Sequence, residues 1–99
     1  MNKYRNHNCN QLRKEDVGKK AILSGWINKK RDHGNLLFID LRDNYGVTQC
    51  IISQDNPNFS SLEKIQLETV LRIEGKVVDR SAETINKEIS TGEIEIVID

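Results

Sequence analysis

Hydrophobic and polar residues alternate along several segments of the chain, a pattern typical of strands with one buried face. The clearest segment is residues 36–43, LLFIDLRD, in which Leu37, Ile39 and Leu41 fall on one side. Because successive strand residues point to opposite faces, these three predict a core face and leave Phe38 outside among charged residues. An aromatic ring in that position either packs locally or binds a ligand.

Residues 43–46, Asp-Asn-Tyr-Gly, predict a turn, since Asp and Asn bond the local backbone and Gly accepts positive φ. With a four-residue hairpin loop, Asp40 lies opposite Gln49, and Phe38 shares their face. Residues 29–35, KKRDHGN, predict a basic loop beside that face. A ring, an amide and several cations suit an unstacked nucleobase, which needs a stacking partner, a hydrogen-bonding partner and counter-charges for its phosphates.

The N-terminal part of the chain predicts one helix and one strand. Residues 10–18 favour a short helix with Asn10 as N-cap and Gly18 as C-terminal stop. Residues 20–28 alternate as a strand, and a glycine in its middle, Gly25, indicates a bulge or strong coiling.

The second half of the chain adds a strand, a helix and two more strands. Residues 46–53 continue from the turn as a strand, and Asp-Asn-Pro at 55–57 then predicts a helix start with Asp55 as its cap. The apolar stripe expected for this helix is Phe59, Leu62 and Ile65. Clean alternation returns in residues 69–79 and 93–99.

The predicted order is β-β-β-α-β-β, which describes an all-β domain with one helix. Five strands in this order predict an OB-fold, a partly open Greek-key barrel that binds oligonucleotides or oligosaccharides on its second and third strands. We expect residues 1–99 to form one such domain, with a short N-terminal helix. The connection at residues 80–92 is long for a hairpin loop, which favours a functional role for it.

Composition narrows the class of protein. The chain has 99 residues, 36% hydrophobic and 30% charged, as expected for one globular domain without a membrane span or signal peptide. Two cysteines, Cys9 and Cys50, are too few for a disulfide framework and favour a reduced, cytoplasmic protein. His7 and Cys9 fall far short of a metal site, and we expect no metal and no catalytic residue.

Charge is distributed unevenly along the sequence. Nine Lys/Arg stand against two acidic residues up to Arg31, a charge of +7, whereas the whole chain has a formal net charge of zero. A one-sided distribution of this kind suits a polyanion, and ordinary solvated surface charges are the alternative.

Four segments resemble the N-terminal anticodon-binding domain of bacterial-type aspartyl-tRNA synthetases. They are CNQLRKEDVGK, GWINKKRDHGNLLFIDLRDNYGVTQ, LRIEGKVVDR and TGEIEI, which together cover most of the chain from Cys9 to Ile98. The asparagine and lysine enzymes of the same subclass share the fold, but their second-strand sequences differ from FIDLRD. The resemblance implies binding of a tRNA anticodon loop with the bases G, U and C.

The resemblance assigns three residues to the central base of the anticodon. It implies that Phe38 stacks under the uracil, that Gln49 bonds its edge, and that Arg31 lies beside the base and backbone. The alternatives are a Phe38 ring that caps the barrel, a solvated Gln49 and an Arg31 that is one of several surface cations.

The resemblance also assigns residues to the outer two bases. Glu95 matches the position that reads the first-base guanine, although its outward alternation alone would make it a solvated carboxylate. Arg80 and Asn86 match positions near the third base. Val78 and Thr84 depart from the family, in which Arg and Asn are frequent at these positions.

His33 lies in the predicted loop at residues 29–35, which borders the bound bases. In the family, His at this position is associated with enzymes that also accept the asparagine tRNA, whose third anticodon base is U rather than C. A neutral imidazole both donates and accepts, so it can satisfy either base. The alternative is an exposed turn residue.

Two further features have structural interpretations. Asp40, Arg42 and Asp43 are interpreted as an ion network at a strand edge, and Trp26 as packing rather than as a stacking platform.

The resemblance places the end of this chain where the linker and catalytic domain of the family begin. ATP- and aspartate-binding motifs are absent, so we expect no cofactor in this chain, with ATP and magnesium serving a separate catalytic domain of a homodimeric ligase. The partner implied is the aspartate tRNA, with the asparagine tRNA as a second. Competing hypotheses are a generic single-stranded nucleic-acid-binding domain, the anticodon domain of the related asparagine or lysine synthetase, and a protein-interaction module.

Overall fold

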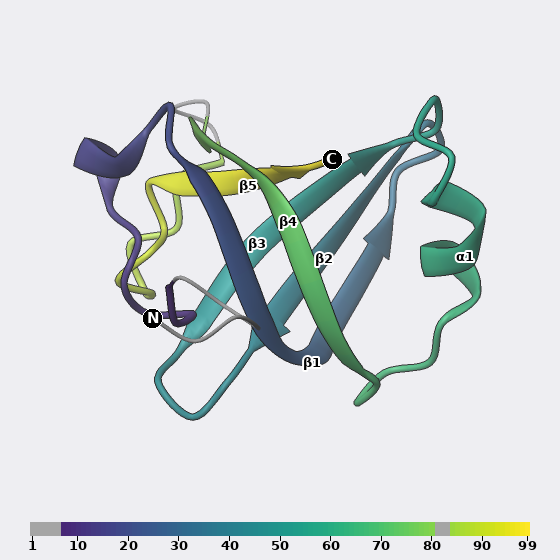
Figure 1. Ribbon diagram of the computed structural model, residues 1–99, viewed down its shortest axis with the longest axis horizontal. Helices are drawn as coiled ribbons and strands as arrows, with labels where there is room; N and C mark the ends of the chain where they lie inside the picture. Colours follow the sequence, from purple (N-terminus) through teal and green to yellow (C-terminus); the bar gives the residue numbers. More distant parts are fainter. Residues whose placement is uncertain (1–6, 81–83) are drawn as a thin grey trace.

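The computed structural model describes residues 7–80 and 84–99 and follows the predicted order of elements (Figure 1). Lys3 and Arg5 of the basic N-terminal part lie outside the described residues. The strands are β1 (Lys20–Asp32), β2 (Leu36–Arg42), β3 (Val47–Ser53), β4 (Val70–Asp79) and β5 (Ile94–Ile98). The helices are a 3-10 turn, η1 (Lys14–Asp16), and α1 (Phe59–Lys64).

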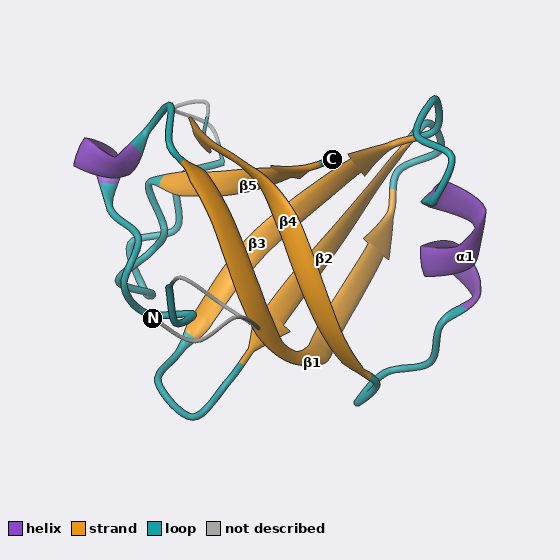
Figure 2. Ribbon diagram, in the orientation of Figure 1, coloured by secondary structure: helices purple, strands orange, loops and turns teal. Residues whose placement is uncertain are grey.

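The five strands close into a barrel in the order β1-β2-β3-β5-β4 (Figure 2). Only β3 and β5 pair in parallel, and the other neighbours are antiparallel. In Figure 1, β1 and β4 cross in front of β2 and β3, and α1 lies beside one end of the barrel. This arrangement confirms the predicted five-stranded OB-fold.

The barrel interior is filled by the residues that alternation predicted. Leu37, Ile39 and Leu41 of β2 are buried, and their neighbours on β2 are not. The other strands contribute these buried apolar residues: Ala21, Leu23, Ile27, Cys50, Ile52, Ile73, Val77, Ile94 and Ile96. Strand β3 departs from strict alternation because Gln49, on its outer face, is also buried. Transfer of this apolar surface out of water is the main force that holds the domain together.

The turn between β2 and β3 has the predicted form. Asp43 donates its backbone N–H to Gly46, and its side chain accepts from the N–H groups of Tyr45 and Gly46 at 2.8 and 3.1 Å. The resulting register sets Asp40 opposite Gln49, as expected. The second oxygen of the Asp43 carboxylate accepts from the Cys9 N–H at 2.8 Å, which fastens the N-terminal segment to this turn.

The predicted N-terminal helix at residues 10–18 is wrong in extent. Only Lys14–Asp16 is helical, in 3-10 form, and Asp16 accepts from the Arg13 N–H at 2.9 Å at its start in place of an Asn10 cap. The segment before it is not helical, and its Leu12 is buried in the core cluster. Gly18 does end the segment, with φ of +95°.

Strand β1 is longer than predicted. It continues through the expected basic loop as far as Asp32, because residues 29–32 pair with β2. The pairing shifts between Ile27 and Lys29, so the bulge lies at Asn28 and not at Gly25. Gly25 has another purpose: a Cβ there would lie 2.2 Å from the Arg42 carbonyl oxygen, where the two strands cross closely.

Helix α1 has the predicted stripe but a different start. Phe59 and Leu62 are buried, and Ile65 packs partly against the core. The helix begins at Phe59, after Pro57, and Asp55 does not cap it. The turn before it is held instead by Asn56, whose side chain accepts from the Asn58 N–H at 2.9 Å. No helix within the described ranges is long and apolar enough to cross a membrane.

Candidate nucleic-acid interface

The outer face of β2 and β3 brings together the ring and the amide that the sequence predicted. Phe38 lies opposite Ile51, and Asp40 lies opposite Gln49, one pair further along the same two strands. Phe38 is half-buried, and its ring contacts that of His33. Because β2 and β3 lie behind β1 and β4 in Figure 1, this face looks away from the viewer.

The β1–β2 turn supports the ring of Phe38. His33 meets it edge-on, with ring centroids 5.0 Å apart and an interplanar angle of 64°. The turn is tight because Gly34 has φ of +80° and donates its N–H to the Asp32 carboxylate at 2.9 Å. His33 therefore lies beside the predicted stacking platform and is exposed to solvent.

Four side chains on four strands form a continuous hydrogen-bonded chain next to Phe38. Arg31 donates both terminal nitrogens to the Asp40 carboxylate at 3.0 Å each, and its Nη2 also donates to Gln49 Oε1 at 2.9 Å. Gln49 Nε2 in turn donates to Glu95 Oε1 at 2.7 Å. We call these residues, Asp40, Arg31, Gln49 and Glu95, the four-strand network.

Electrostatics fix the geometry of this network. The hydrogen bond and charge of Asp40 raise the pKa of Arg31, so the guanidinium stays charged. Gln49 is only 6% exposed, and a flip of its amide would set the NH2 group against a guanidinium and the carbonyl against a carboxylate. The amide is therefore held in one orientation, with its oxygen toward Arg31 and its nitrogen toward Glu95.

The sequence interpretation of Asp40, Arg42 and Asp43 as one ion network is wrong. Asp40 pairs with Arg31 across β1 and β2, Asp43 is buried in the turn, and Arg42 is exposed. Parity along a single strand could not reveal this pairing. The signal lies between strands: the bulge at Asn28 moves Lys29 opposite Asp40, which sets Arg31 within reach of the same carboxylate.

One cation of the predicted basic loop, Lys30, serves α1 and not this interface. Lys30 donates its Nζ to the carbonyl oxygens of Leu62, Glu63 and Ile65 at the C-terminal end of α1. This ammonium satisfies the last carbonyls of the helix and is no phosphate ligand as it stands. Lys29 is exposed and remains a candidate for a phosphate.

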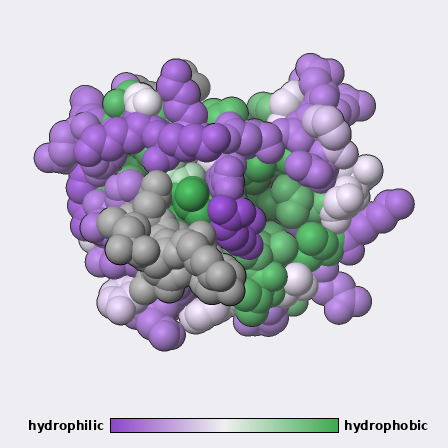
Figure 3. Space-filling view, viewed as in Figure 1, coloured by the Kyte–Doolittle hydropathy of each residue, from purple (hydrophilic) through white to green (hydrophobic). Residues whose placement is uncertain are grey.

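The opposite outer face of the barrel, formed by β1 and β4, is turned toward the viewer in Figure 3. It carries a hydrophilic band with hydrophobic residues to one side. Two ion pairs lie on it: Lys20 contacts Asp99 at 3.0 Å, and Arg72 contacts Glu74 at 2.6 Å. Lys20, one of the nine cations up to Arg31, is therefore paired on this face and not at the predicted interface.

Arg80 stands where β4 ends, at the start of the long connection to β5. It is 7% exposed and donates its Nε to the Ile94 carbonyl at 2.9 Å and its Nη1 to the Thr84 carbonyl at 3.1 Å. Burial lowers the pKa of Arg80, and the charge of Glu95 opposes that effect. The side chain holds the connection against β5.

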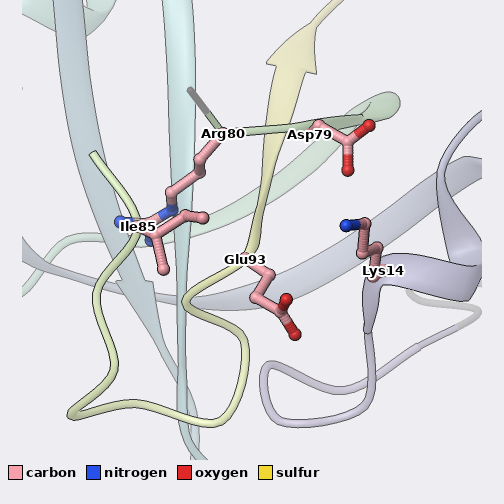
Figure 4. Close-up of a pocket in the computed structure, with 5 residues that line it drawn as sticks. All are labelled: Lys14, Asp79, Arg80, Ile85 and Glu93. Atoms are coloured by element: carbon pink, nitrogen blue, oxygen red, sulfur yellow. The ribbon is translucent and has the colours of Figure 1, made fainter. Parts of the chain in front are cut away.

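Two shallow clefts flank this connection. The first, of about 220 Å³, is lined by residues that include Lys14, Asp79 and Glu93, and Figure 4 shows Lys14 and Asp79 pointing into it from opposite sides. The second, of about 320 Å³, is lined in part by Asn86. Asn86 is exposed, and its side-chain oxygen accepts from the Glu88 N–H at 3.0 Å. Residues 81–83 of the connection lie outside the described residues.

A family model of tRNA anti-codon type, described as OB-fold nucleic acid binding domain, matches residues 21–99. The chain belongs to this family. An aspartate–tRNA(Asp/Asn) ligase of Pelagibacter ubique is 68% identical over 98 residues, and one of Phenylobacterium zucineum is 54% identical over 98. These alignments cover 99% of this chain but only 16% and 17% of the two ligases. They confirm the resemblance found in the sequence.

Solved structures of this family's fold match across the barrel at low sequence identity. An asparaginyl-tRNA synthetase of Pyrococcus horikoshii matches with a TM-score of 0.77 at 23% identity, over 93% of this chain and 20% of that one. An OBody bound to hen egg-white lysozyme matches with a TM-score of 0.78 at 17% identity, over 99% of this chain and 91% of that one. The fold therefore occurs both within a synthetase and as a chain of about this size.

Proposed function

We propose that this chain recognises a tRNA anticodon loop, as one domain of a ligase that charges the aspartate and asparagine tRNAs with aspartate. The observation that carries the proposal is that half-buried Phe38 lies on the same outer face as the oriented amide of Gln49. A base that is splayed out of a loop offers a π-face and a Watson–Crick edge, and this surface offers a partner for each.

The central base is bound by the ring and the amide together. Phe38 stacks on one face of the base, and Gln49 uses what the four-strand network leaves it, one N–H donor and one lone pair of Oε1. A donor and an acceptor side by side match the edge of uracil, with its ring N–H and neighbouring carbonyl. Arg31 adds positive charge beside the base and the backbone.

Glu95 binds the first anticodon base, guanine. One of its oxygens is bonded to Gln49, and its second oxygen is the acceptor available to a guanine N–H. The Watson–Crick edge of guanine carries two neighbouring N–H groups, which a carboxylate accepts and which other bases do not present together.

The third base is read loosely in this proposal. Arg80 is occupied by backbone carbonyls and shapes the connection, whereas the exposed Asn86 is the polar group available to a base. His33 supplies a group that both donates and accepts, beside Phe38. Loose reading agrees with the relatives, which are named aspartate–tRNA(Asp/Asn) ligases.

The chemistry of aminoacylation belongs to the rest of the longer protein in this proposal. The chain spans about a sixth of the relatives it matches, and they are named ligases as whole proteins. ATP and magnesium would be used there, in the cytoplasm and in a homodimer, and this chain would supply tRNA binding without catalysis.

The proposal is tested by titrating the chain with anticodon stem-loops at several salt concentrations. We expect weak, salt-dependent binding, with G-U-C and G-U-U loops bound within about tenfold of each other and a loop with a changed central base bound more weakly. Equal affinity for all loops would support a generic single-strand binder instead. Absence of salt-dependent binding to any loop would refute the proposal and leave a protein-interaction module.

A further inference from the structure

Asp40 is the one member of the four-strand network to which the proposed function gives no role in binding a base. Its carboxylate lies on the outer face of β2, half-buried, and receives both terminal nitrogens of Arg31. Paired, fork-like bonds of this kind hold a guanidinium in position and direction, which a single contact does not. The third bond of that guanidinium goes to Gln49 Oε1.

We infer that Asp40 is a positioning residue for base discrimination, which acts through Arg31 to hold the Gln49 amide in one orientation. The inference rests on the proposed function and adds to it the source of discrimination at the central base. Asp40 itself need not touch the RNA.

The physical reason is that a side-chain amide has two faces related by a flip. Rotation by half a turn exchanges a donor for an acceptor, so a freely rotating glutamine bonds uracil in one orientation and cytosine in the other. Uracil presents a ring N–H beside a carbonyl, and cytosine presents a ring acceptor beside an amine. A glutamine that can flip therefore discriminates poorly between the two pyrimidines at the same place.

Both ends of the network oppose the flip. After rotation, the NH2 group of Gln49 would face the Arg31 guanidinium, and its carbonyl would face the Glu95 carboxylate. The first repulsion exists only while Arg31 stays where Asp40 holds it. Loss of the Asp40 charge frees the guanidinium to swing away, and one of the two restraints on the amide disappears.

Simple electrostatics predicts a different result when the Asp40 charge is removed. Removal of a negative charge beside an RNA site strengthens binding to every loop, because the phosphates are no longer repelled. The positioning role instead predicts that binding to cytosine-containing and uracil-containing loops becomes more alike. The ratio of the two affinities therefore separates the two effects, whereas either affinity alone does not.

The test measures the affinity of the chain for G-U-C and G-C-C stem-loops, for wild type, Asp40→Asn and the control Asp55→Asn. The control removes the same charge from an exposed turn outside the interface. We expect the U-to-C affinity ratio to fall roughly tenfold in Asp40→Asn, the loss for one charged hydrogen bond, and to stay unchanged in the control. The side-chain NH2 resonances of Gln49 in the free chain should shift in Asp40→Asn and not in the control.

A second variant, Asp40→Glu, keeps the charge and moves the carboxylate by one methylene. Its U-to-C affinity ratio is expected to lie closer to that of wild type than the ratio of Asp40→Asn does. Melting curves establish that both variants are folded. A ratio within about twofold of wild type in folded Asp40→Asn overturns the inference, as does a ratio that falls further in folded Asp40→Glu than in Asp40→Asn. If wild type itself binds the G-U-C loop no more tightly than the G-C-C loop, the proposed function fails instead, so the two failures are distinct.

Discussion

Truncation of Phe38 to alanine tests whether the ring serves binding or the core. Phe38 lies on the outer face of β2 and is half-buried, and its ring centroid is 5.0 Å from that of His33. Loss of one base stack weakens RNA binding by about 1–3 kcal/mol, which is roughly 5- to 150-fold in affinity. Binding to the G-U-C stem-loop should fall by that amount in Phe38→Ala.

The cost in stability should be smaller than for a core ring. Partial burial of Phe38 and its contact with His33 together contribute about 1–2 kcal/mol to the free energy of unfolding. Full truncation of a core phenylalanine costs about 3–5 kcal/mol. The chain has one other phenylalanine, Phe59, which is 7% exposed in α1 and offers a matched control.

The control variant is Phe59→Leu, which should lose about 1–2 kcal/mol of stability by removing part of a buried side chain. Both variants are unfolded in urea, followed by the fluorescence of the single tryptophan, Trp26, and RNA affinities are compared per folded molecule. Phe59→Leu should bind as wild type. The reasoning is refuted if Phe38→Ala binds as tightly as wild type and loses as much stability as a core truncation.

Four further substitutions have expected outcomes. Asp43→Ala should lower the free energy of unfolding in urea by about 1–3 kcal/mol, because three backbone N–H groups lose their buried acceptor. Lys29→Ala should reduce the salt slope of RNA binding by about 1, whereas Lys30→Ala should leave it unchanged and destabilise α1. The hydrogen bond that Lys19 donates to Asp16 holds the pKa of this carboxyl below its usual value of about 4. Its stabilisation is therefore present above that value and lost as pH falls through the folded pKa, so the stability difference between wild type and Asp16→Asn should shrink in acid. An unchanged salt slope for Lys29→Ala, or a difference for Asp16→Asn that is independent of pH, would contradict these assignments.

The sequence by itself determined the strands, their inward faces and the local turn. Alternation has a period of two in any strand, so the core positions Leu37, Ile39 and Leu41 followed from it without knowledge of any partner. The turn that begins at Asp43 followed from residues that bond their own backbone, and it set the parity that joins Phe38 to Gln49. These signals are local, and the fold confirmed them.

The extent of helices and strands depended on contacts that are distant in sequence. β1 continued through a basic segment because β2 pairs with it, and in the segment predicted as a helix at residues 10–18, Leu12 packs in the core while only Lys14–Asp16 is helical. The capping role of Asp55 was wrong for a local reason, since the side chain of the next residue, Asn56, holds the turn before α1. Propensity is a weak preference that tertiary contacts override at the ends of elements.

Only the tertiary structure decided what the charged residues do. Lys30 and Arg31 are neighbours in a basic segment, yet one satisfies the end of α1 and the other completes the four-strand network. Alternation assigns a side chain to a face, but a hydrogen bond needs a partner at a set distance on another strand. Barrel closure and the bulge at Asn28 supply that distance, and neither is encoded in the pattern of any single segment.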